Sequence, residues 1–218
     1  MLVGGAGAGS AHAGPSAPAT GRVVGHVAIT DADGKPADAE AIIYVVGFKE
    51  PPANQITEIA QKNRAFVPDL VAITVGESVS FPNRDQILHN VFSESAARRF
   101  DLGSFKTDDK KSKDFPEPGV IDVYCNIHPE MAATILVLPN RAHTRRGKDG
   151  AYAIAGVPPG TWTVFAYTRR VAKPASAQVT VVAGQDATVD LALQRGAEPP
   201  HLNKYGEKYH DVDTTPYR

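Results

Sequence analysis

A single cysteine, Cys125, is followed by a histidine and a methionine at the spacing Cys-x2-His-x2-Met. A thiol, the imidazole of His128 and the thioether of Met131 therefore fall within seven residues. Sulfur ligands with imidazole select copper over hard cations, and two histidines, one cysteine and a weak methionine ligand define an electron-transfer copper site. The second imidazole must come from elsewhere, and His89 in the segment 81–92 is the candidate. The ligands of such a site must stay in place while copper changes oxidation state, so they need a rigid scaffold.

Two motifs around these residues resemble the cupredoxins, the small blue-copper proteins of the amicyanin and plastocyanin type. The first motif is Phe-x-Asn-x-Asp followed by His-Asn-Val in residues 81–91, and the second is Tyr-Cys-x2-His-Pro-x-Met in residues 124–131. The short second loop, with Pro129 directly after His128, is most similar to the amicyanin branch. The resemblance covers roughly residues 56–139 and contains four ligand types in the family's order.

This resemblance implies a Greek-key β-sandwich that binds one mononuclear type 1 copper ion. The implied ligands are His89, Cys125, His128 and Met131. In the family, the residue at the position of Asn90 hydrogen-bonds between the ligand loops near the thiolate, so Asn90 is expected to stiffen the site. The family also implies that one edge of the His128 ring is exposed as the electron port. Taken singly, a cysteine is usually a buried small hydrophobe, and that is the alternative for Cys125.

Two separated segments resemble a carboxypeptidase-regulatory-like, transthyretin-type β-sandwich. Residues 22–30 and 41–46 have the alternation and β-branched composition of strands, and residues 31–36 have turn chemistry, so together they resemble that family's opening hairpin. The family's continuation, Asp-Gly-x-Tyr followed by Gly-Val-Pro-Pro-Gly-x-Trp, occurs only in residues 149–164. We therefore expect the copper domain to be inserted into a discontinuous sandwich, because insertions at exposed hairpins are tolerated. The alternative is that residues 22–46 add strands to the cupredoxin.

The predicted fold class is all-β, with a Greek-key cupredoxin β-sandwich plus a second small β-sandwich. Within the copper region, residues 56–63 are expected to form one strand, and residues 93–113 a variable polar loop with a short strand at 100–102. The predicted divisions are a signal remnant or flexible tail at 1–21, the discontinuous sandwich at 22–50 and 141–195, the copper domain at 56–140 and an extended tail at 196–218.

The N-terminal segment resembles the end of an export signal. Residues 1–21 are mostly glycine, alanine, serine and proline, and no charged residue precedes Arg22. The triplet at 11–13, Ala-His-Ala, fits a small-x-small cleavage site, although the positively charged start of a signal peptide is missing. We interpret the segment as a truncated signal, which predicts a periplasmic protein, and a flexible tail is the alternative. No apolar run reaches the about 18 to 20 residues that span a membrane.

The predicted function is single-electron transfer between redox protein partners by a monomeric copper protein that is not an enzyme. Copper oxidases and nitrite reductases need further histidine clusters, typically His-x-His pairs, and the seven histidines of the chain form none. Copper storage, delivery or sensing is the alternative, but methionine-rich tracts are missing, since Met1 and Met131 are the only methionines. A net charge of −1 without a long basic run gives no reason to expect nucleic acid as a partner.

Overall fold

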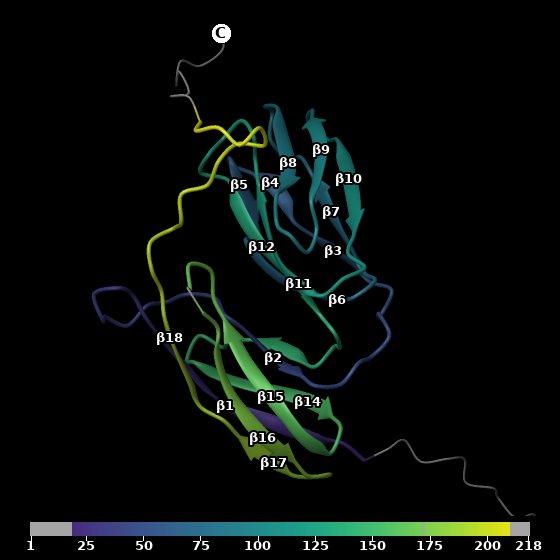
Figure 1. The fold of residues 1–218 in the computed structure, drawn as a ribbon, viewed down its shortest axis with the longest axis vertical. Helices are drawn as coiled ribbons and strands as arrows, with labels where there is room; N and C mark the ends of the chain where they lie inside the picture. The colour runs from purple at the N-terminus through teal and green to yellow at the C-terminus, as the bar shows by residue number, and fades with distance from the viewer. Residues whose placement is uncertain (1–18, 172, 210–218) are drawn as a thin grey trace, which may run out of the picture.

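The computed structural model describes residues 19–171 and 173–209 of the 218-residue chain. These residues form strands and no helix, which confirms the predicted all-β class. Figure 1 shows the strands gathered in two β-sandwiches, one above the other. The expected cleavage site at 11–13 lies outside the described residues. Within the described part of the chain, no helix has the length and apolar character needed to cross a membrane.

The lower unit in Figure 1, here called the split sandwich, combines strands from both ends of the chain. One sheet contains β14 (Ala151–Val157), β1 (Gly21–Thr30), β17 (Asp186–Thr188) and β18 (Leu191–Gln194). The other sheet contains β13 (His143–Arg145), β2 (Ile42–Val46), β15 (Gly160–Tyr167) and β16 (Ala175–Val181). Burial alternates along β1, as expected for a strand with one face on the core. The expected hairpin is wrong, because β1 and β2 lie in different sheets.

The upper unit, here called the central sandwich, is built from residues between β2 and β13. Its five-stranded sheet contains β6 (Leu70–Thr74), β12 (Ala132–Leu138), β11 (Gly119–Tyr124), β8 (His89–Ser93) and β9 (Phe100–Phe105). A three-stranded sheet contains β10 (Lys110–Asp114), β7 (Ser78–Pro82) and β3 (Ile56–Glu58). A hairpin of β4 (Ala60–Lys62) and β5 (Ala65–Val67) completes the unit.

Two local predictions in the central sandwich are wrong. The expected strand at 56–63 is divided into β3 and β4, because Ile59 is buried between them and its N–H donates to the carbonyl of Ser80. In the expected loop at 93–113, the short strand at 100–102 is present but extends to Phe105 as β9, and a further strand, β10, is not expected from the sequence. Strand β10 has the sequence Lys-Lys-Ser-Lys-Asp and pairs only with β7, so it is a charged edge strand without an apolar signal.

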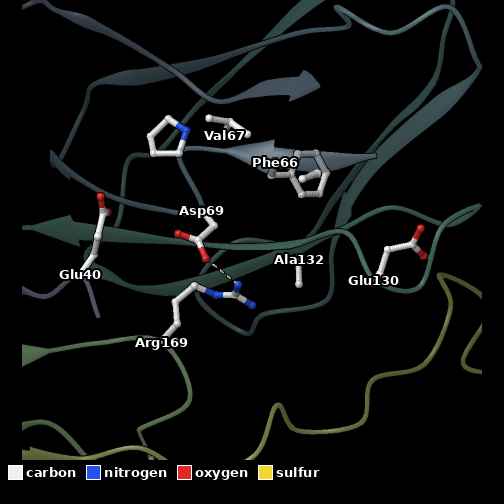
Figure 2. A pocket seen from close by; sticks show the side chains of 9 residues that line it. Glu40, Phe66, Val67, Asp69, Glu130, Ala132 and Arg169 are labelled. Carbon is white, nitrogen blue, oxygen red and sulfur yellow. Dashed lines mark hydrogen bonds and ion pairs between the residues drawn. The ribbon is translucent and has the colours of Figure 1, made fainter. Parts of the chain in front are cut away.

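The two sandwiches meet through a small apolar cluster and several polar contacts. The buried members of the cluster are Ile42, Tyr44, Leu70, Leu136, Leu138 and Tyr167. The chain enters and leaves the central sandwich at neighbouring points, since the N–H of Glu50 donates to the carbonyl of Pro139 at 3.0 Å. A pocket of about 400 Å³ lies beside this junction, and Arg169 pairs there with Asp69 at 3.0 Å. Figure 2 shows the side chains that line it, with Glu130 among them.

Candidate metal centre

Strand pairing brings the sequence-predicted ligands to one end of the central sandwich. His89 is the first residue of β8, and Cys125 directly follows β11, which pairs with β8 through Tyr124 and Phe92. His128 and Met131 lie in the loop between β11 and β12. Two backbone bonds close this loop: the N–H of Cys125 donates to the carbonyl of Met131 at 3.2 Å, and the N–H of Met131 donates to the carbonyl of His128 at 3.1 Å.

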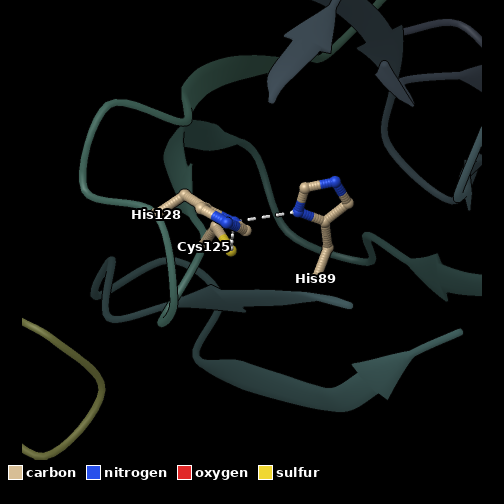
Figure 3. A group of neighbouring side chains, drawn as sticks. All are labelled: His89, Cys125 and His128. Carbon is tan, nitrogen blue, oxygen red and sulfur yellow. Dashed lines mark hydrogen bonds between the residues drawn. The ribbon is translucent and has the colours of Figure 1, made fainter. Parts of the chain in front are cut away.

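Three potential donor atoms converge at this end of the sheet (Figure 3). The Nδ1 atoms of His89 and His128 are 3.0 Å apart, and the Cys125 sulfur lies 3.7 Å from Nδ1 of His128. All three donors lie within 4.8 Å of one another, and all three residues are buried. Met131 is fully buried in the same apolar cluster as Cys125. In residues 19–171 and 173–209, this is the one group of three or more His, Cys, Asp or Glu side chains with such spacing.

The Cys125 sulfur accepts two backbone hydrogen bonds. The N–H groups of Asn90 and Ile127 each lie 3.4 Å from it. Burial raises the pKa of the Cys125 thiol, and these N–H groups oppose that effect without cancelling it. The thiol is therefore neutral in the metal-free protein near pH 7. Because these two N–H groups already point at the sulfur, they would stabilise a thiolate once a cation is bound.

The side chain of Asn90 connects the two ligand loops. Its Oδ1 atom accepts the N–H of Asn126 at 3.3 Å, within the Cys125 loop. Its Nδ2 atom donates to Oδ1 of Asp101 at 2.8 Å and to the carbonyl of Gly103 at 3.0 Å, both on β9. Asn90 is buried, so these bonds are shielded from water. They fix the distance between β8, which bears His89, and the loop that follows β11.

Asp85 ends the Phe-x-Asn-x-Asp motif, but the sequence predicts no role for it at the site. Its Oδ2 atom lies 2.8 Å from Nε2 of His89. An ionised carboxylate only accepts hydrogen bonds, so Nε2 of His89 is the donor and Nδ1 keeps its lone pair for the site. The backbone N–H groups of Asn63 and Arg64 also donate to this carboxylate, at 2.6 and 2.9 Å. Asp85 precedes His89 by four residues in an irregular loop, so no periodic signal links them.

The hydrogen bonds around Asp85 keep its carboxylate ionised. Burial by itself would raise the pKa of Asp85, but the N–H of Arg64, the ring of His89 and the N–H of Asn63 outweigh it, so the pKa lies below its ordinary value. Asn63 and Arg64 both have positive φ angles, 56° and 55°. This two-residue turn joins β4 to β5 and directs both N–H groups at the carboxylate.

His128 lies at the boundary between the site and the solvent. Only 7% of the surface of His128 is exposed, so the expected electron port offers little area to the solvent. Burial lowers the pKa of His128, and the neighbouring ring of His89 and the guanidinium of Arg64 act in the same direction. Next to His128 in the loop, Glu130 forms an exposed ion pair with Arg64 at 3.1 Å. A charged pair therefore lies beside the expected electron port.

Solved structures of copper proteins are similar to part of the chain. A purple cupredoxin from Nitrosopumilus maritimus is 25% identical over 37% of this chain and 98% of its own, with a TM-score of 0.34. A copper(I) amicyanin mutant is 19% identical over 44% of this chain and 97% of its own, with a TM-score of 0.36. A copper-containing nitrite reductase from Thermus scotoductus SA-01 is 21% identical over 43% of this chain and 25% of its own, with a TM-score of 0.37. No protein-family model and no curated protein sequence matches the chain.

Proposed function

We propose that the chain binds one copper ion through His89, Cys125, His128 and Met131 and transfers single electrons as a type 1 copper protein. The observation that supports this most is the convergence of two imidazole nitrogens and one thiol sulfur in a buried site, with a fully buried methionine in the same loop. This donor set suits copper electron transfer, whereas Ca²⁺ and Mg²⁺ require oxygen ligands.

The spacing of the donors fits a single first-row transition metal ion. With zinc as a guide, nitrogen and sulfur ligands lie about 2.0 to 2.3 Å from the ion, so two donors stand no more than about 4.6 Å apart. The separations of 3.0 Å between the imidazoles of His89 and His128 and 3.7 Å between His128 and Cys125 satisfy this limit, and all three donor atoms lie within 4.8 Å of one another. The three donor atoms of His89, Cys125 and His128 thus lie close to the spacing that one shared ion requires.

Copper bound at this site would supply a one-electron couple. Asp85 orients the ring of His89 through Nε2, while the N–H groups of Asn90 and Ile127 stabilise negative charge on the Cys125 sulfur. Because these groups are held by hydrogen bonds and packing, a change in the charge of the site requires little movement of the protein. Such rigidity favours electron exchange with redox protein partners, and the exposed edge of His128 is the proposed point of contact.

We further propose that residues 56–140 form a copper domain inserted between residues 22–50 and 141–195 of a discontinuous sandwich. The strand pairings support this division, because β1 and β2 pair only with strands that follow the central sandwich. Likeness of the split sandwich to the carboxypeptidase-regulatory type stays a prediction. A periplasmic, monomeric electron carrier without enzymatic activity is the setting we propose, since an oxidising compartment suits a lone thiol held by a metal.

A copper titration of the full chain tests the proposal, with Cys125→Ser as the variant. The wild type is expected to bind one equivalent of Cu²⁺ with an intense thiolate-to-copper absorption band and a narrow hyperfine splitting in electron paramagnetic resonance. Cys125→Ser is expected to lose the band, because the hydroxyl that replaces the thiol cannot give this transition. Stoichiometric copper uptake by the wild type without the band would contradict electron transfer and would favour copper storage, delivery or sensing.

A further inference from the structure

The C-terminal segment 196–209 lies on the candidate metal centre, although it follows the last strand of the split sandwich. We call it the C-terminal strap. In Figure 1 it is the yellow trace that leaves β18, passes along both sandwiches and reaches the top of the central one. The sequence predicts only an extended tail here, without a role at the site. The structure places residues of this segment against the loop that contains Cys125.

Three hydrogen bonds join the strap to the metal centre. The hydroxyl of Tyr209 donates to the backbone carbonyl of Cys125 at 2.8 Å. The backbone N–H of Lys204 donates to Oδ1 of Asn126 at 2.9 Å, and its Nζ atom pairs with Oδ2 of Asp101 at 2.7 Å. The strap therefore contacts the peptide group of the thiol ligand, the side chain of the next residue and a carboxylate on β9.

These contacts extend the hydrogen-bond network around the sulfur. The Asp101 carboxylate that binds Lys204 through one oxygen accepts Nδ2 of Asn90 through the other. Asn90 in turn accepts the N–H of Asn126 through its side chain and donates its own backbone N–H to the Cys125 sulfur. Lys204 therefore binds both partners of the Asn90 side chain: Asp101 through Nζ and Asn126 through its backbone N–H. Asn90 in turn supplies one of the two N–H groups directed at the sulfur.

The strap is fixed in this position by a turn of its own and by aromatic stacking. Asn203 is buried, and its Oδ1 atom accepts the N–H groups of Tyr205 and Glu207, at 2.9 and 3.0 Å. The ring of His201 stacks on Tyr124, the residue before Cys125, with centroids 3.9 Å apart and planes at 14°. A segment held in this way presents Lys204 in a defined position and differs from a tail that lies loosely on the surface.

We propose that the C-terminal strap completes the metal centre, with Tyr209 and Lys204 as positioning residues for the Cys125 loop. By holding the Cys125 carbonyl and the Asn126 side chain, they keep the N–H groups of Asn90 and Ile127 directed at the sulfur. The effect on bound copper rests on the proposed function, whereas the effect on the loop itself does not. Weaker hydrogen bonds to the thiolate leave more electron density on it, so the reduction potential falls when the strap is released.

Amide hydrogen exchange of the metal-free full-length chain tests whether the strap restrains the loop that contains Cys125. The variants are Tyr209→Phe, which removes only the hydroxyl, and Lys204→Met, which removes the charge and keeps the apolar stem. Tyr205→Phe is the matched control, because this neighbouring tyrosine is 71% exposed. The amide protons of Asn126 and Ile127 are expected to exchange about fivefold faster in the two strap variants than in the control. Equal exchange in all three variants would overturn the proposal.

The same three variants are then compared with copper bound. Tyr209→Phe and Lys204→Met are expected to lower the reduction potential and to release copper to a chelator several times faster, while Tyr205→Phe matches the wild type. Faster exchange with an unchanged potential and release rate would show that the strap only covers the loop, and would overturn a positioning role. A wild type without the thiolate-to-copper band would contradict the proposed function, and the exchange result would then decide the strap's hold on the loop by itself.

Discussion

The two sandwiches bury their sheets with different side chains. Aliphatic residues form most of the core of the split sandwich, as in the contacts of Val23, Ile43 and Ile154. The core of the central sandwich is built around four buried phenylalanines and also includes Cys125 and Met131. Its buried polar residues include Gln61, Asn83, His89, Asn90 and His128. The difference teaches that the sandwich with the candidate site also buries most of the polar side chains, and that His89, Asn90 and His128 among them belong to the site.

The largest effects are expected from cavities in the two cores, which test whether the sandwiches are independent. Phe81→Ala in the central sandwich is expected to lower the free energy of unfolding by about 3 to 5 kcal/mol, and Ile154→Ala in the split sandwich by about 2 to 5 kcal/mol. Both side chains are almost fully buried. Denaturant unfolding followed by the copper band and by the fluorescence of Trp162, which lies in the split sandwich, separates the two transitions.

Phe81→Ala is expected to lower the midpoint of the copper band most, and Ile154→Ala that of Trp162. Equal shifts of both signals in both variants would break the comparison, because the sandwiches would then unfold as one cooperative unit.

Two buried asparagines, one at the candidate site and one away from it, separate the effect of a substitution on stability from its effect on the metal centre. Asn90 and Asn140 each donate two hydrogen bonds through Nδ2 and accept one backbone N–H through Oδ1. Replacement of either by alanine leaves backbone groups without partners, so each variant is expected to lose about 1 to 3 kcal/mol of stability. Only Asn90→Ala is expected to change the copper spectrum and potential. A spectrum changed equally by Asn140→Ala would contradict a local role for Asn90.

Acid is expected to destabilise both sandwiches of the metal-free protein. Burial is the main reason why the pKa values of His128 and His143 lie below the ordinary value of 6.5. Below about pH 6.5 the unfolded chain therefore binds protons that the folded chain resists, so stability falls with pH until the folded pKa values are reached. His143→Gln is expected to flatten part of this slope, measured by unfolding at several pH values. The difference in stability between wild type and His143→Gln at pH 8, where histidine is neutral, measures the effect of the substitution on packing alone. An unchanged dependence of stability on pH in the variant would contradict the prediction.

The smallest effect is expected at the exposed ion pair beside the site. Arg64 and Glu130 are each about half exposed, and surface pairs contribute less than about 1 kcal/mol. Glu130→Gln is therefore expected to leave the unfolding free energy nearly unchanged and to alter mainly the salt dependence of reaction with charged redox proteins. Stopped-flow electron transfer at several ionic strengths measures this. A large loss of stability would show that the pair braces the ligand loop.

The sequence predicts the all-β class and a compact set of ligand candidates, because both leave local patterns. The alternation of apolar and polar residues identifies β1, and the Cys-x2-His-x2-Met spacing at Cys125 indicates metal binding. Asp85 belongs to the Phe-x-Asn-x-Asp motif, but its bond to His89 leaves no periodic signal, and the role of the strap depends on contacts between distant segments. Tyr209 reaches Cys125 across 84 positions of the chain. Strand β10 was missed for another reason, because an edge strand with polar side chains is defined by its backbone pairing alone.

The pairing of β1 and β2 with strands from the end of the chain has a consequence for synthesis on the ribosome. Both strands emerge first, yet β14, β15 and β18 appear only after the whole central sandwich has been made. The central sandwich can therefore fold while β1 and β2 still lack their partners, since most of its strands pair with one another. During translation, the backbone groups of β1 and β2 therefore stay unpaired until the later strands emerge. We expect a chaperone to protect the nascent chain during this interval.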